Sequence, residues 1–172
     1  SLETLDLAGC QSVTDLSGIK GLTNLTTLNL GWGGKSRTDA SGIEGLTSLE
    51  TLSLESCRSL TNVSGLGGLT SLKTLDLKNC KSLTDVSGLE GLTQLERLNL
   101  RTCEALTNLS GLETLTSLKS LNLKGCKSIT HFPDLAGLTD LETIDLQWCE
   151  ALEDISGFEG LTSLETLNLC WC

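Results

Sequence analysis

Hydrophobic residues recur along the chain in one pattern that returns about every 23 residues. Segment 71–93 reads SLKTLDLKNCKSLTDVSGLEGLT, and the segment that begins at Gln94 repeats the same order of apolar and polar positions. Full units begin at residues 1, 24, 48, 71, 94, 117 and 140, and a partial eighth begins at 163. Each full unit has 23 residues except the second, which has 24. The chain therefore provides its own alignment of one supersecondary unit.

The first half of each unit predicts a short β-strand. In segment 72–77, Leu75, Asp76 and Leu77 alternate between apolar and polar, the period of two that places successive side chains on opposite faces of a strand. If one such strand per unit stacks in parallel at about 4.8 Å, the units build a single sheet of about eight short strands.

The second half of each unit predicts tight turns. Its apolar residues in segment 83–92 lie three apart, which suits short 3₁₀ turns better than an α-helix. Side-chain oxygens of Asp85 and Ser87 can cap these turns. We therefore expect one solenoid domain over residues 1–172, with no second domain and no conventional helix longer than about two turns.

The repeated core Leu-x-x-Leu-x-Leu-x-x-Cys resembles the leucine-rich repeat family over the whole chain. LTDVSGLEGLTSL is similar to bacterial internalin-type repeats, whereas the 23-residue length and LNLKGCKSITHFPDL are similar to repeats of plant intracellular immune receptors; both subtypes stay open. The resemblance implies an α/β solenoid, a right-handed superhelix with a concave parallel sheet and convex 3₁₀ turns. Such solenoids serve mostly in protein recognition.

Seven cysteines occupy one column of the repeat: Cys10, Cys57, Cys80, Cys103, Cys126, Cys149 and Cys172. A small buried thiol can donate a weak hydrogen bond to the backbone of a neighbouring turn, so we expect a structural ladder. Stacked thiols rarely have disulfide geometry, and without a Cys-x-x-Cys or His-plus-Cys cluster no zinc site or other cofactor is expected. Free thiols favour a reducing, cytoplasmic location.

The outward strand positions are the candidate recognition surface, because the other columns are committed to core or turns. Four cations gather there, called here the basic stripe: Lys78, Arg97, Arg101 and Lys124. Segment 71–139 holds 8 of the 12 basic residues but only 7 of the 22 acidic ones. This predicts a docking site for an acidic or phosphorylated protein. Alternatively, the cations only solvate the sheet and neutralise Asp76 and Glu96.

Two further features interrupt the pattern. Tryptophans share the column at the edge of the sheet, where they could anchor a partner or pack over a loop: Trp32, Trp148 and Trp171. Trp148 and Trp171 stand on neighbouring units and should lie close together. In the second unit, Gly33 replaces the column cysteine and Arg37 replaces an apolar residue, so we expect a protruding, flexible loop over residues 31–39.

Composition argues against several classes of function. A net charge of −10 argues against a general nucleic-acid binder, and no apolar stretch approaches the length of a membrane span. With His131 as the one histidine, no catalytic constellation can be assembled, so we do not expect an enzyme. Two hypotheses remain: a recognition module that binds on the concave face, or a consensus-like or engineered scaffold without its own activity. We also expect a piece of a longer array whose uncapped ends self-associate.

Overall fold

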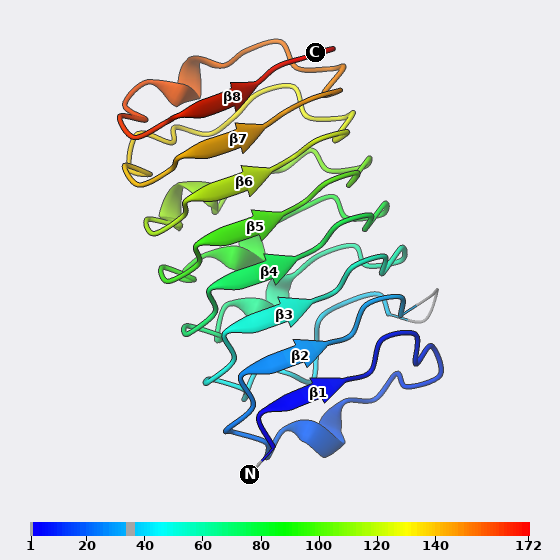
Figure 1. Ribbon diagram of the computed structural model, residues 1–172. Coiled ribbons are helices and arrows are strands. Elements are labelled where there is room, and N and C mark those ends of the chain that lie inside the picture. Colours follow the sequence, from blue (N-terminus) through cyan, green and yellow to red (C-terminus); the bar gives the residue numbers. More distant parts are fainter. Residues whose placement is uncertain (1, 34–36) are drawn as a thin grey trace.

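The computed structural model describes residues 2–33 and 37–172, which stack as successive rungs from the blue end to the red end of Figure 1. In this described part, eight parallel strands form one sheet in chain order, as predicted. The strands are β1 (Thr4–Asp6), β2 (Thr27–Asn29), β3 (Thr51–Ser53), β4 (Thr74–Asp76), β5 (Arg97–Asn99), β6 (Ser120–Asn122), β7 (Thr143–Asp145) and β8 (Thr166–Asn168).

The register between strands follows the sequence repeat. Leu75 of β4 pairs with Leu98 of β5, and Leu98 pairs with Leu121 of β6, so each pairing joins the same column of successive units. Because the register never slips by one residue, every strand turns the same columns inward and outward. The outward columns consequently form continuous rows across the sheet.

The return segments contain 3₁₀ turns, as the spacing of three predicted, and the described ranges contain no helix long and apolar enough to cross a membrane. The turns are η1 (Ser17–Ile19), η2 (Ser64–Leu66), η3 (Ser87–Leu89), η4 (Leu112–Thr114) and η5 (Ser156–Phe158). The predicted role of Asp85 is confirmed, since its Oδ1 accepts the backbone N–H of Ser87, the first residue of η3, at 2.7 Å. A Cβ at Gly88 would lie 2.5 Å from the Val63 carbonyl oxygen, so glycine lets these rungs approach.

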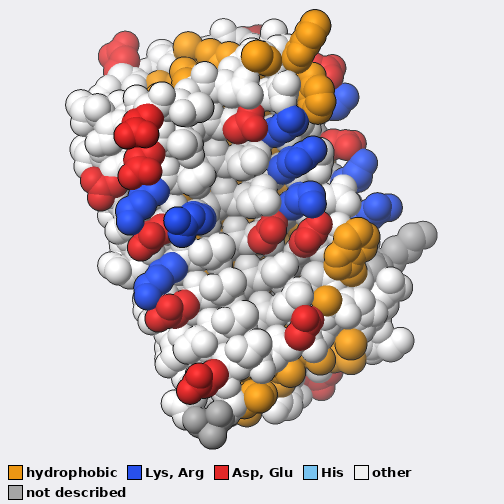
Figure 2. All heavy atoms as spheres, viewed as in Figure 1, with side chains coloured by type: hydrophobic (Ala, Val, Ile, Leu, Met, Phe, Trp, Pro, Cys, Tyr) orange, Lys and Arg blue, Asp and Glu red, His pale blue; other side chains and the backbone are white. Residues whose placement is uncertain are grey.

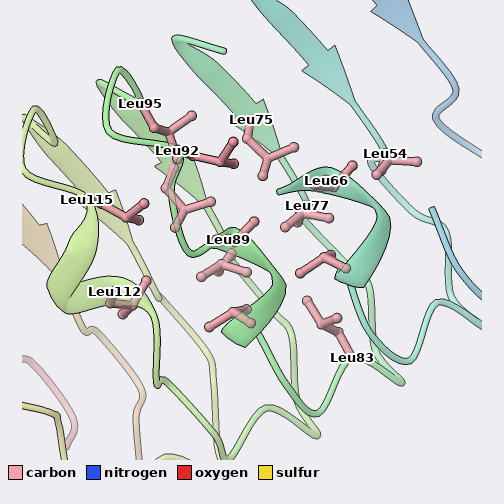
Figure 3. Close-up of a cluster of buried hydrophobic side chains, with 14 of the residues drawn as sticks. Leu54, Leu66, Leu75, Leu77, Leu83, Leu89, Leu92, Leu95, Leu112 and Leu115 are labelled. Atoms are coloured by element: carbon pink, nitrogen blue, oxygen red, sulfur yellow. The ribbon is translucent and has the colours of Figure 1, made fainter. Parts of the chain in front are cut away.

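The core lies between the sheet and the return segments. In the fourth rung every inward side chain is at most 1% exposed: Leu72, Leu75, Leu77, Cys80, Leu83, Val86, Leu89 and Leu92. Figure 3 shows leucines of adjacent rungs meeting in this space. Each fully buried leucine contributes roughly 1.5–3 kcal/mol relative to an exposed one. At the two ends of the stack the same columns are open, with Leu2 47% and Leu167 38% exposed.

The second rung differs from the sequence prediction. Residues 34–36 lie outside the described residues, but the flanking Gly33 and Arg37 are buried, so the prediction of a protruding segment is wrong for these two. Arg37 turns inward because its Nη2 donates to the Val13 carbonyl of the first rung at 3.1 Å. A Cβ at Gly33 would lie 3.2 Å from Cys57 Sγ and 3.3 Å from Arg37 Nε, so the arginine occupies the space left free by the missing side chain.

Candidate functional site

A side-chain oxygen ends each strand. Asp76 Oδ1 accepts the backbone N–H of Lys78 at 2.9 Å, which turns the chain away from the sheet two residues after the strand's last position. The same bond recurs after the neighbouring strands, from Arg101 N–H to Asn99 at 3.1 Å and from Lys124 N–H to Asn122 at 3.0 Å. The interpretation of Lys78, Arg101 and Lys124 as strand positions is therefore wrong: they lie in the turns that follow the strands.

The next position in these turns is left-handed, a feature that the sequence analysis missed. Positive φ angles recur in one column: Gly9, Trp32, Ser56, Asn79, Thr102, Gly125, Trp148 and Trp171. Glycine and asparagine tolerate this conformation, and their presence in the column was the signal that could have predicted it. Trp148 and Trp171 both have φ of 64° and are 43% and 75% exposed, so bulky side chains project where glycine would be the least strained choice.

Both lysines of the basic stripe contact neighbouring rungs. Lys78 Nζ lies 2.9 Å from Glu55 Oε1, and Lys124 Nζ lies 4.6 Å from the ring centroid of Trp148. The first contact is an ion pair and the second has the geometry of a cation–π interaction. The alternative raised by the sequence named Asp76 and Glu96 as the carboxylates that these cations neutralise. Lys78 pairs instead with Glu55, which lies in the turn after β3, so this alternative is wrong for Lys78.

The two arginines of the stripe behave differently. Within the described part of the chain, the exposed Arg97 and Arg101 side chains have no hydrogen-bond or ion-pair partner. Glu96, the other carboxylate considered for this role, pairs with Lys119 at 3.2 Å instead. Each guanidinium is thus left with its full set of N–H donors for a ligand.

The face over the strands is shallowly hollowed. One hollow of about 280 Å³ lies over β4, β5 and β6, and its polar lining comes from Thr74, Asp76, Arg97, Asn99, Ser120 and Asn122. A second, of about 250 Å³, continues over β6, β7 and β8. Figure 2 shows Lys and Arg side chains in two groups on either side of a paler band over the strands. The hollows are lined largely by uncharged hydroxyl and amide side chains, and the charged residues among their lining are Asp76, Arg97 and Asp145.

The predicted proximity of Trp148 and Trp171 is confirmed. Both line a surface pocket of about 370 Å³ together with Glu150 and Cys172. The Glu150 carboxylate lies 3.1 Å from Lys127 Nζ, so its charge is already compensated. The Lys124 ammonium lies over the Trp148 ring. This contact joins the two tryptophans, called here the aromatic edge, to the basic stripe.

The cysteine column forms the predicted ladder through its inner rungs. From the third rung onward, each thiol of the column donates to a backbone carbonyl of the preceding rung: Cys57 to Leu30, Cys80 to Leu54, Cys103 to Leu77, Cys126 to Leu100, Cys149 to Leu123 and Cys172 to Leu146. The Sγ–O distances are 3.1–3.5 Å. Cys10 and Cys172, at the two ends, are exposed. All eight cysteines are free, and the described residues contain no group of three metal-binding side chains.

Burial changes the chemistry of the inner thiols. Desolvation of the thiolate raises the pKa of Cys149 to about 12, and the neighbouring Cys172 adds a smaller repulsive contribution. Desolvation also raises the pKa of Cys57, Cys80, Cys103 and Cys126. Since the thiolate is the nucleophile and the metal ligand, these side chains are held in an unreactive form, which suits a structural role.

Comparisons with known proteins place these features in context. A family model described as Leucine Rich repeats (2 copies) matches residues 47–91 and 70–114, and one described as Leucine Rich repeat matches residues 1–20. Together these matches span about half of the chain. Among curated protein sequences, no match reaches significance.

Solved structures show the same architecture. Internalin C2 of Listeria monocytogenes is 30% identical over 90% of this chain, with a TM-score of 0.66. The leucine-rich repeat domain of the type III effector XopL is 26% identical over 90% of the chain, also at 0.66. Internalin F of Listeria monocytogenes, 22% identical over 97% of the chain at 0.62, shares the fold. The chain covers 66% of each internalin structure and 55% of the effector structure.

Proposed function

Because the chain belongs to the leucine-rich repeat family, whose repeats commonly form protein–protein interaction modules, we propose that it recognises a protein partner through the open face of its sheet. The observation that carries the proposal is the pair of uncompensated guanidinium groups, Arg97 and Arg101, on a protein of net charge −10. Unpaired arginines on a surface whose other cations are engaged favour an acidic partner.

The proposed contact surface extends from the basic stripe to the aromatic edge. Lys78 and Lys124 lie one rung to either side of Arg101, and Trp148 with Trp171 forms a margin where a partner could bury apolar surface. Tryptophan and arginine are the residue types that most often dominate binding energy at interfaces. The partner proposed is therefore an acidic protein, whose charge speeds its approach and whose apolar side chains reach the tryptophans.

A photo-crosslinking experiment tests which face binds. A photoreactive residue placed at Thr143 on β7 should capture a partner in an extract of the cells from which the chain comes. The same residue at Lys20, in the exposed turn after η1, should not. Crosslinks from Lys20 alone would contradict the proposal, and capture from neither position would favour a scaffold with no partner on this face.

Charge reversal then tests the electrostatic part. Replacing Lys78, Arg101 and Lys124 by Glu should slow association with the captured partner by about tenfold or more and reverse its salt dependence. Lys20→Glu, on the far side of the stack, should change the association rate little. Comparable slowing by both variants would show that overall charge, and not the stripe, controls binding.

We also propose that the chain functions in a reducing, cytoplasmic compartment. The support is that all eight cysteines are free, three of them exposed. Trapping thiols with a maleimide reagent immediately after cell lysis should find Cys10, Cys170 and Cys172 reduced. Recovery of these cysteines in oxidised form would contradict this location.

A further inference from the structure

The turn-ending asparagines on β5 and β6 present hydrogen-bond donors to the sheet face. A backbone N–H can only donate, so the atom of Asn99 that faces Arg101 N–H must be Oδ1, and the same holds for Asn122 facing Lys124 N–H. The Nδ2 group of each amide is then directed away from the turn. Neither Nδ2 has a hydrogen-bond partner within residues 2–33 and 37–172. Each amide therefore offers two free donors.

These donors lie next to Arg97, the one charged residue among the first residues of the eight strands. Arg97 pairs in register with Ser120, and Asn99 pairs with Asn122, so the outward side chains of β5 and β6 form a square. All four line the same hollow. Ser120 Oγ accepts a hydrogen bond from the Thr143 hydroxyl at 2.9 Å, which leaves the Ser120 proton free to donate. The four side chains are thus all hydrogen-bond donors, and the carboxylate that lines the same hollow, Asp76, belongs to the neighbouring strand β4.

We propose that this β5–β6 square (Arg97, Asn99, Ser120 and Asn122) binds the carboxylate of an aspartate or glutamate side chain in the partner. The inference rests on the proposed function and names the chemistry that the sheet face selects. A planar carboxylate can accept two hydrogen bonds from a guanidinium and further bonds from the amides, all of them strengthened by the ligand's charge.

The neighbouring strands favour a carboxylate over a phosphate. Asp76 of β4 pairs in register with Asn99, and Asp145 of β7 pairs with Asn122, so a carboxylate stands on each side of the donors, about 4.8 Å away per strand. A phosphate group carries roughly −1.5 to −2 charges and is repelled more strongly than a single negative charge. The flanking aspartates can also accept backbone N–H groups of an extended segment that crosses the strands.

A titration with a short peptide tests the square directly. The probe is Ac-Gly-Ser-Glu-Ser-Gly-NH₂, followed through the side-chain amide NMR signals of Asn99 and Asn122. We expect saturable shifts of both signals and little change at Asn29, which occupies the same column on β2. The Gln analogue of the probe should produce no saturable shift, because it lacks the charge that strengthens each hydrogen bond.

Matched variants separate recognition from folding. Asn99→Asp keeps the oxygen that ends the strand, as Asp76 does natively, but replaces the free donors with a carboxylate. It should weaken binding of the probe by about tenfold or more, as should Arg97→Thr, which installs the residue found at Thr74. Asn29→Asp makes the same chemical change outside the square and should leave the affinity unchanged.

A third peptide carries phosphoserine in place of the Glu of the probe. Three results would overturn the assignment: no saturable shift at Asn99 and Asn122, tighter binding of the phosphoserine peptide than of the glutamate probe, or equal weakening by Asn29→Asp. Retention of the Arg101 amide signal at its native position confirms that the turn still forms in Asn99→Asp. If partner crosslinks from Thr143 persist while the probe fails, only the carboxylate assignment is wrong. If the probe binds and the crosslinks are absent, the proposed function is wrong.

Discussion

Stacked buried thiols should make the fold sensitive to alkali. Burial raises the pKa of Cys149 to about 12, and it raises the pKa of Cys80, Cys103 and Cys126 as well. In the unfolded chain an ordinary thiol has a pKa of about 8.5. The stabilisation linked to these protons is therefore complete below about pH 8.5, and it is lost progressively as the pH rises from there to the folded-state values.

The size of the effect follows from the number of rungs. At about pH 10 an unfolded thiol is almost fully ionised while a buried one stays protonated, which favours unfolding by about 2 kcal/mol for each thiol. The four thiols of Cys80, Cys103, Cys126 and Cys149 then remove about 8 kcal/mol together. Total stabilities of domains are roughly 5–15 kcal/mol, so the stack should be close to unfolding at this pH.

The assay is urea denaturation under reducing conditions, followed by circular dichroism at about pH 7, 9 and 10. Cys103→Ser is the matched control, because its hydroxyl can still donate to the Leu77 carbonyl, which accepts from Cys103 Sγ at 3.2 Å, but does not ionise in this range. The variant should lose about 2 kcal/mol less than the native chain between pH 7 and pH 10. A native-chain free energy of unfolding that changes by less than about 2 kcal/mol would refute the reasoning.

Four further outcomes are expected. In native buffer a thiol reagent should label Cys10, Cys170 and Cys172 in a fast phase, and the five buried thiols only as fast as the fold opens. Mass spectrometry of the labelled peptides can check this, and labelling of Cys103 in the fast phase would contradict the ladder. Arg37→Leu should raise the urea stability by about 1–2 kcal/mol, because buried Arg37 Nε has no partner within the described residues; an unchanged midpoint would count against this. Hydrogen bonds from Ser156 lower the pKa of Asp154, so the stabilisation that this carboxylate gives is present above about pH 3.9 and is lost on acidification. The urea midpoint of Asp154→Asn should therefore fall less between about pH 5 and pH 3 than the midpoint of the native chain. Taken alone, segment 1–172 exposes Leu2 and Leu167 at the two ends of its stack and should self-associate at high concentration; a monomer by light scattering would contradict that expectation.

The sequence alone determined the architecture, because the information lies in a short repeated pattern. Alternation around Leu75 predicts a strand, and spacing by three after Leu83 predicts 3₁₀ turns. Each rung contacts mainly its neighbours, so a constant period also fixes the register and stacks the cysteines. The hydrogen bond from each inner thiol to the preceding rung was predictable for the same reason.

Only the tertiary structure decided which side chains are free to bind. Lys78 and Arg101 look equivalent in the repeat, yet Lys78 meets Glu55 of the preceding rung whereas Arg101 has no side-chain partner within the described residues. The burial of Arg37 likewise depends on a carbonyl one rung away. These outcomes depend on distances and rotamers between rungs, which a column pattern does not specify. The column gives a side chain its direction, but the contacts of neighbouring side chains decide whether its charge is already satisfied.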